Sequence, residues 1–215
     1  ENCFGPERAA RWADPEGGFI HVMHRAHWGD MHYVITGKDE DGNVTYEGGW
    51  QNNRPSPMHR DHRFAENIFE ELDAPGEWYL NRDTGTLYYY PLPGETMADV
   101  RVVAPVLTST LVSFNGEASK DEIVQHVHFR GISFFHSNAD LRRLRNPGQG
   151  EIYQPGLIMA TGLRNASFED CTFAHTGAHG IWLAAGCEDN RVRRCHIYDL
   201  GGGGVKIGNA GGAHS

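Results

Sequence analysis

The sequence of 215 residues lacks several features that would place it in a class at once. No apolar run approaches the roughly 20 residues that a membrane-spanning helix needs, so we expect no membrane span. The chain has no excess of basic residues: Asp and Glu number 28 against 19 Lys and Arg, and the net charge of −9 argues against nucleic acid as a partner. Neither a signal peptide nor an initiating methionine is present, and we expect the chain to be a fragment of a longer protein.

Cysteine is also scarce, and no CxxC pair occurs that would indicate a structural zinc site. Cys171 and Cys195 stand 24 residues apart, and we favour stacked, inward-facing free thiols over a disulfide between them. The GGGG run at 201–204 lacks the GKS or GKT ending and the following helix of a phosphate-binding loop. It predicts a tight corner of the chain instead.

What the sequence does contain is a repeat in its last third. Residues 168–183 read FEDCTFAHTGAHGIWL and residues 192–207 read VRRCHIYDLGGGGVKI. At a shift of 24, apolar residues fall on apolar residues and glycine falls on glycine, and residues 156–159 continue the pattern one step earlier. A period in this range, with short β-rich runs and glycine turns, is typical of a β-solenoid whose coils bury one another's apolar faces.

The chain divides into two regions of different character. In residues 101–215 the run VHFRGISFFHS repeats at an offset of 39 rather than 24, and the extra residues predict a loop insertion at about 138–155. Residues 1–100 contain alternating runs around the turns DEDGN and NRDTG, which predict hairpins, and AENIFEELD predicts one short helix that ends before Pro75. We therefore expect an all-β protein, an antiparallel β module followed by a parallel β-helix with 24 residues per coil.

Strand alternation predicts which solenoid side chains face solvent. If Ile181 and Leu183 point inward, Trp182 points outward, and the same rule places Lys206 and Ile158 in one external column with it. The adjoining turn adds more polar residues: His136, His175, His179 and Asp199. An exposed indole offers a flat apolar face to a sugar ring, and the polar groups offer directed hydrogen bonds to its hydroxyls.

These residues predict a carbohydrate site on one face of the solenoid. Asp199 is the catalytic candidate, and the candidates for substrate binding are Trp182, Lys206, His175, His179 and His136. Alternatives stay open for three of them. Trp182 can be a lone surface aromatic or one covered by another part of the protein, Lys206 a solvated lysine, and Asp199 a turn residue that satisfies backbone N–H groups.

Two further clusters lie in the first region. The segment HVMHRAHWGDMH, with His59 and His62, is rich in a common metal ligand, but its strand-and-loop pattern without an HExxH helix favours no metal. Hydrolysis of a glycosidic bond commonly needs two carboxyl groups. Four glutamates near the predicted helix, Glu66, Glu70, Glu71 and Glu77, are favoured as caps or surface charges rather than as that pair. We expect no cofactor.

The sequence resembles a known group of proteins. RFAENIFEELDAPGEWYLNRDTGTLYYYP, followed by VHFRGISFFHS, CTFAHTGAHGIWL and CHIYDLGGGGVKI, is similar to bacterial right-handed parallel β-helix proteins of polysaccharide degradation, most of all to glycoside hydrolases of families 141 and 120. The resemblance implies a right-handed β-helix with a β-sandwich module and action on fucosyl- or xylosyl-containing glycans. It also implies a two-carboxylate mechanism, a secreted or periplasmic location, a polysaccharide or oligosaccharide substrate and a monomer.

Two other hypotheses use the same scaffold. A polysaccharide lyase or uronate epimerase needs a base and a cation that neutralises the uronate, for which Lys206, His175, Arg193 and Arg194 are available. The other hypothesis is a non-catalytic glycan-binding β-helix, which needs neither a catalytic base nor such a cation.

Overall fold

The computed structural model describes residues 6–27, 29–51, 54–55, 57–107, 110–139 and 151–209. The chain forms two compact units, the first ending at Val102 and the second beginning at Val103. Within the described ranges, no helix has both the length and the apolar character that crossing a membrane requires.

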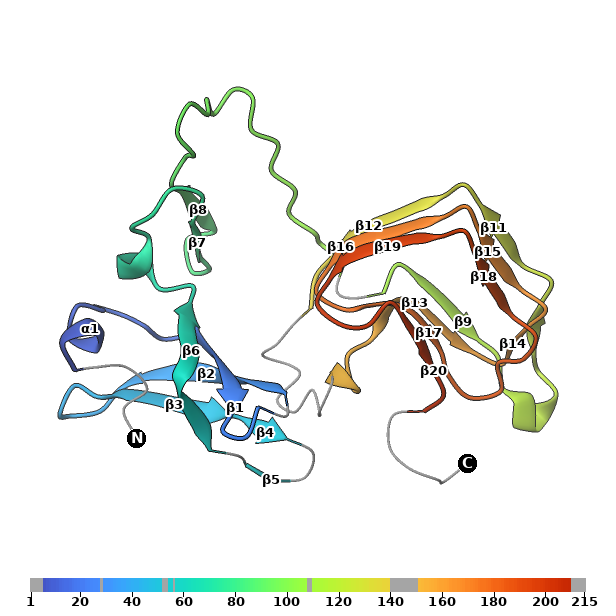
Figure 1. Cartoon of the computed structure of the whole chain (residues 1–215), viewed down its shortest axis with the longest axis horizontal. Coiled ribbons are helices and arrows are strands. Elements are labelled where there is room, and N and C mark those ends of the chain that lie inside the picture. The colour runs from blue at the N-terminus through green and yellow to red at the C-terminus, as the bar shows by residue number, and fades with distance from the viewer. Residues whose placement is uncertain are drawn as a thin grey trace. The chain divides into compact units, whose positions relative to one another are not determined.

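The first unit is built on an antiparallel sheet with the strand order β3–β2–β1–β6 (Figure 1). Its strands are β1 (Phe19–His24), β2 (Asp30–Lys38), β3 (Val44–Gly48) and β6 (Met58–Glu66). One face of the sheet is apolar, because Ile20, Val22, Met31 and Ile35 are buried in one cluster with Trp12. The hairpin predicted around DEDGN is confirmed by the antiparallel pairing of β2 with β3.

The other elements of this unit are short. They are α1 (Pro6–Ala10), β4 (Trp50–Gln51), β5 (Arg54–Pro55), a 3-10 helix (Phe69–Glu71), β7 (Trp78–Asn81) and β8 (Thr86–Tyr89). The hairpin predicted around NRDTG is confirmed, since β7 and β8 pair antiparallel.

The predicted short helix in AENIFEELD is wrong. Its first residues belong to strand β6, and only the single 3-10 turn at 69–71 follows. The chain turns at Asn67, whose φ of 55° is left-handed and whose side-chain oxygen accepts the N–H of Leu80 at 3.0 Å. Ile68 is then buried in the sheet's core. Tertiary contacts therefore override a helical pattern too short to be stable by itself.

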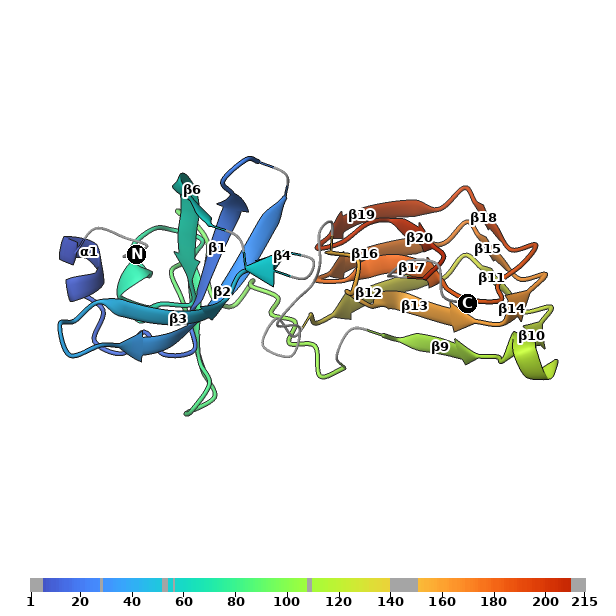
Figure 2. The same ribbon diagram turned by 90° about the horizontal axis from the view of Figure 1, so that it is seen from below.

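The second unit is a solenoid of stacked parallel strands (Figures 1 and 2). Its first sheet, in the order β20–β17–β13–β9, contains β9 (Val112–Asn115), β13 (Gly156–Thr161), β17 (His179–Leu183) and β20 (Val205–Ile207). The second sheet contains β11 (His128–Arg130), β15 (Ser167–Glu169) and β18 (Arg191–Arg193). The third contains β12 (Ser133–Ser137), β16 (Thr172–Thr176) and β19 (His196–Leu200). A short pair, β10 (Val124–Gln125) with β14 (Leu163–Arg164), and a 3-10 helix (Ala118–Lys120) complete the coils.

The interior of the solenoid is a ladder of aromatic rings. Phe129 stacks on Phe168 with ring centroids 5.3 Å apart, and Phe134 stacks on Phe173 at 5.0 Å. Phe168 and Phe173 are fully buried. Because like residues repeat at the same place in each coil, every coil supplies the apolar surface that its neighbour needs.

The predicted register is confirmed for most of the solenoid. Phe168 pairs with Val192 and Ile181 with Val205, both at the predicted shift of 24, and Phe129 pairs with Phe168 at the predicted shift of 39. The predicted loop insertion falls between β12 and β13, and its residues 140–150 lie outside the described part of the chain.

The register fails in one place, and this overturns the prediction for Ile158. Ile158 pairs with Ile181 at a shift of 23 and is fully buried, so it does not belong to the external column. The turn that follows β13 is one residue shorter than the turn that follows β17. Met159 is the residue that pairs with Trp182.

Corners between the sheets repeat one backbone conformation. Equivalent residues of successive coils have φ between 50° and 67°: Gly131, Asp170 and Arg194 at one corner, and His126, Asn165 and Asp189 at another. Left-handed residues are otherwise uncommon outside glycine, and Asn, Asp and His are enriched among them. The corners therefore place polar side chains in vertical rows on the outside of the solenoid.

Candidate functional site

The predicted external column of the first solenoid sheet exists, with Met159 in place of Ile158. Trp182 pairs with Lys206, and both are half-buried. The Lys206 ammonium lies 3.2 Å from the centroid of the indole ring, a cation–π contact, and donates to the carbonyl of Ile152. The Trp182 indole N–H donates to the carbonyl of Gly208 at 2.7 Å. Burial lowers the pKa of Lys206. The polar atoms of the pair are thus engaged within the chain.

The third solenoid sheet carries a row formed by His136, His175 and Asp199. Each of the three has a left-handed backbone, with φ of 61°, 55° and 50°. The imidazoles of His136 and His175 stack with ring centroids 5.1 Å apart and 12° between their planes. His175 Nδ1 lies 2.6 Å from Asp199 Oδ2. Three of the predicted site residues therefore meet on one surface.

Aromatic side chains surround this row. Phe135 and Tyr198 both contact His175, with ring centroids 5.4 Å away, and His196 stacks on Tyr198 at 4.5 Å. Side chains of both hydrogen-bonded residues reach solvent, 38% exposed for His175 and 67% for Asp199. We call this surface the aromatic–imidazole face: Phe135, His136, His175, His196, Tyr198 and Asp199.

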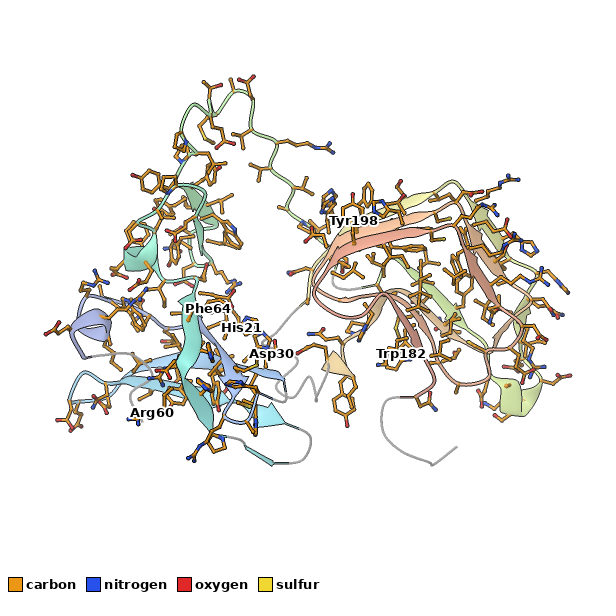
Figure 3. The ribbon with its side chains drawn as sticks, in the orientation of Figure 1. His21, Asp30, Arg60, Phe64, Trp182 and Tyr198 are labelled. Atoms are coloured by element: carbon orange, nitrogen blue, oxygen red, sulfur yellow. The ribbon has the colours of Figure 1, made fainter. Side chains whose placement is uncertain are left out.

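Three residues of this face, Phe135, His196 and Tyr198, were not predicted, although strand alternation in the sequence indicates them. Phe134 and Ile197 are core positions, so alternation places Phe135, His196 and Tyr198 on the outside. The predicted outward-facing column covers the first sheet alone. The predicted residues also separate into two groups. Trp182 lies on the first sheet, whereas His175 and Asp199 lie on the third sheet, which also carries Tyr198 (Figure 3).

His179 lies in the interior rather than on either surface. It is 4% exposed, and Gly203 N–H donates to its Nδ1 at 2.6 Å. Its Nε2 lies 2.9 Å from the carbonyl oxygen of Glu151 and donates to it. Both ring nitrogens are therefore used in holding two turns of the chain together.

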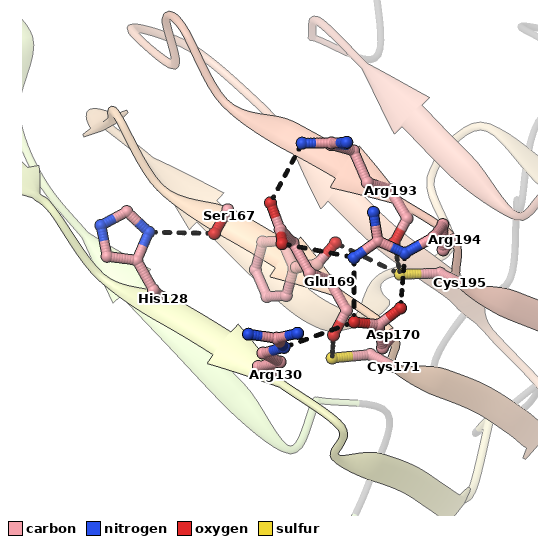
Figure 4. Close-up of polar contacts among 10 residues, drawn as sticks. His128, Arg130, Ser167, Glu169, Asp170, Cys171, Arg193, Arg194 and Cys195 are labelled. Atoms are coloured by element: carbon pink, nitrogen blue, oxygen red, sulfur yellow. Dashed lines mark hydrogen bonds and ion pairs between the residues drawn. The ribbon is translucent and has the colours of Figure 1, made fainter.

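The second solenoid sheet bears a shallow cleft of about 480 Å³ on its outer side. Its lining residues are His126, His128, Phe129, Arg130, Asn165, Ala166, Ser167, Glu169, Asp189 and Arg191. His128 Nδ1 lies 2.9 Å from the hydroxyl of Ser167 (Figure 4).

Arg193 and Arg194 form ion pairs with Glu169 and Asp170 beside this cleft (Figure 4). Arg194 holds Asp170 through two hydrogen bonds of 2.7 and 3.0 Å, and these keep the pKa of Asp170 below its usual range. Arg193 lies 3.7 Å from Glu169. Both arginines are thus paired with carboxylates of the preceding coil.

The four glutamates of the first unit have local partners. Glu71 accepts from the indole of Trp12 at 2.5 Å and pairs with Arg8. Glu70 accepts the N–H of Ala13, and Glu77 accepts two backbone N–H groups of its own turn. Glu66 lies 3.8 Å from His21.

Parallel coils, a stacked aromatic core and rows of polar corner residues define a parallel β-helix. Comparison with known families agrees, since residues 112–215 match the family described as right handed beta helix region. A search of curated proteins found no match.

A solved structure titled "Glycoside hydrolase" has a similar fold, with a TM-score of 0.73 and 22% sequence identity. The match covers 88% of this chain but 38% of that one, so the chain spans well under half of the length of the protein it resembles. At this identity the likeness establishes the fold.

Proposed function

We propose that this chain is part of a secreted glycoside hydrolase that cleaves side chains of plant or microbial polysaccharides, with α-L-fucosides or β-xylosides as substrates. Three observations support the proposal. The fold is a right-handed β-helix, a solved structure with a similar fold is titled a glycoside hydrolase, and the sequence resembles β-helix enzymes of this class.

The aromatic–imidazole face is the proposed binding site. The observation that carries this assignment is the 2.6 Å hydrogen bond between His175 and Asp199 on a surface lined by aromatic rings. Tyr198 and Phe135 offer apolar rings to the C–H face of a sugar, and the imidazoles offer hydrogen bonds to hydroxyls. His175 fixes the direction of the Asp199 carboxyl group, which we assign as one of the two carboxyl groups of the mechanism.

Replacing Asp199 tests the assignment. In the enzyme assayed on chromogenic aryl α-L-fucosides and β-xylosides, Asp199→Asn should lower kcat/KM by about 10²- to 10⁴-fold, the usual contribution of an acid–base group. Asp121→Asn is the matched control, because Asp121 is another exposed, left-handed aspartate on the solenoid. No turnover on a broad glycan panel, or equal activity in the two variants, would refute the proposal.

A second candidate function rests on the cleft of the second sheet. Two histidines and two arginines line it, His126, His128, Arg130 and Arg191, and these groups suit the carboxylate of a uronate. A polysaccharide lyase or uronate epimerase would use such a cleft. Growth of ultraviolet absorbance from an unsaturated product on uronate polymers, lost in Arg191→Gln, would favour a lyase over hydrolysis. Glycan binding without any turnover would favour a non-catalytic β-helix.

A further inference from the structure

Two histidines and an aspartate meet on the sheet of the first unit. His21 and His32 are direct cross-strand partners on β1 and β2, and Asp30 begins β2. Their neighbours Ile20, Val22 and Met31 point into the core, so alternation places the histidines on the opposite face of the sheet. Figure 3 labels His21 and Asp30 there.

The distances within this group suit a metal centre. One ligand atom from each of His21, Asp30 and His32 lies within 4.8 Å of the others. His21 Nε2 and Asp30 Oδ2 are 2.8 Å apart, and the rings of His21 and His32 are 4.1 Å apart. Two ligands of a tetrahedral zinc ion, each at about 2.0–2.1 Å from the metal, are about 3.3 Å apart. Small side-chain rotations would therefore bring all three atoms into one coordination sphere.

Two further observations point to a ligand at this place. Among the residues that the structure describes, the buried His32 Nδ1 has no hydrogen-bond partner, whereas buried polar atoms are normally paired. Glu66 lies 3.8 Å from His21 Nδ1, on the side of the ring away from Asp30. A carboxylate in that position commonly fixes the orientation of a histidine that binds metal through its other nitrogen.

We propose that the first unit binds a divalent transition metal ion, zinc or a similar ion, through His21, Asp30 and His32, with Glu66 orienting His21. Two imidazole nitrogens and one carboxylate oxygen are borderline donors that suit zinc and its first-row neighbours better than magnesium or calcium. Three protein ligands leave a coordination position open for water or a ligand.

A second trio, His27, His59 and His62, also brings ligand atoms within 4.8 Å of one another. It fits a metal less well. His59 Nδ1 accepts the backbone N–H groups of Asp61 and His62, each at 3.1 Å. A neutral imidazole that accepts at Nδ1 carries its proton on Nε2, so it has no second lone pair to offer. This trio provides the control.

Metal titration of the whole, tag-free chain after chelator treatment tests the proposal. We expect one equivalent of Zn²⁺ by calorimetry and visible absorption bands on addition of Co²⁺. Asp30→Asn and His21→Gln should weaken binding at least about tenfold, and Glu66→Gln should weaken it by about 10- to 100-fold, as loss of an outer carboxylate usually does. His59→Gln should leave the affinity unchanged.

Three results would overturn the proposal: no uptake of Zn²⁺ or Co²⁺ by the unaltered chain, unchanged binding in Asp30→Asn, or loss of binding in His59→Gln. Asp30 is the safest position for the decisive variant, because its side chain is 41% exposed and outside the core. Circular dichroism of each variant checks the fold. The readout is metal binding, so it is independent of any glycosidase activity.

Discussion

At the scale of single residues, left-handed backbone positions arrange polar side chains on the surface of the solenoid. The sequence predicts Asp199 either as a catalytic group or as a turn residue, and it lies within strand β19 with a left-handed φ of 50°. Its carboxyl group faces His175 and solvent. Asp and His adopt this backbone conformation more readily than most residues, so the same position in successive coils carries His136, His175 and Asp199.

Gly201 tests how tightly one corner is packed. A Cβ added there would lie 2.6 Å from the backbone oxygen of Gly177 in the coil before, and backbone cannot move aside cheaply. We expect Gly201→Ala to lower the free energy of unfolding by about 1–3 kcal/mol, as overpacking does. Gly131→Asn is the control, because nothing lies within 4 Å of a Cβ at Gly131. Urea unfolding should separate the two variants, and equal stability would contradict the packing.

The pairing of Arg194 with Asp170 predicts a titration shift. Arg194 holds the pKa of Asp170 below its usual range, mainly through the side-chain hydrogen bonds. Arg194→Gln should raise that pKa, and Arg130→Gln should raise it less. In the unaltered chain the stabilisation is present above the usual pKa of an aspartate and is lost as the pH falls through the lowered value. Carbon NMR of the Asp170 carboxyl group measures the midpoint, and an unchanged value in Arg194→Gln would disprove the pairing.

At the scale of elements, apolar periodicity predicted the strands because each coil repeats the same burial. The shift of 24 follows from Phe168 over Val192 and from Trp182 beside Lys206, and the structure has both pairs. The single misplaced residue, Ile158, arose where one turn differs in length by one residue. The run GLIMA aligns apolar residues with the next coil at a shift of 23 as well as at 24. The hydrophobic pattern therefore could not distinguish the two registers.

Interior aromatic stacking should dominate the stability of the solenoid. Phe168 is fully buried, where it stacks on the ring of Phe129 and meets the ring of Phe173 edge to face. Its truncation to alanine should cost about 3–5 kcal/mol, because a large buried ring leaves a cavity. Tyr90→Ala, at a residue that is 43% exposed, should cost far less. Chemical denaturation followed by circular dichroism distinguishes the two, and a small effect of Phe168→Ala would contradict the assigned core.

The proposed metal ligands lie on neighbouring strands rather than on one helix. The strand-and-loop pattern of HVMHRAHWGDMH, without an HExxH helix, favours no metal. Ligands on strands need no such spacing, since β1 and β2 bring His21 opposite His32 across the sheet. That register depends on the β1–β2 turn, and the sequence pattern alone does not fix it.

At the scale of the whole molecule, the sequence predicted the architecture better than the site. The repeat predicted the stacked parallel coils, and the hairpin signals predicted the antiparallel strands. Whether the predicted site residues lie together depends on which sheet of the solenoid carries each of them. His136, His175 and Asp199 lie together, whereas Trp182 and Lys206 lie on another sheet and His179 lies inside.

The central claim is that the aromatic–imidazole face binds a sugar. The most direct test is a crystal structure of the chain with a fucosyl- or xylosyl-containing oligosaccharide. We predict a sugar ring stacked on Tyr198 or Phe135, with a hydroxyl or glycosidic oxygen in hydrogen-bond contact with Asp199. A sugar bound at the Trp182 column or in the cleft of the second sheet, with the aromatic–imidazole face empty, would contradict the claim.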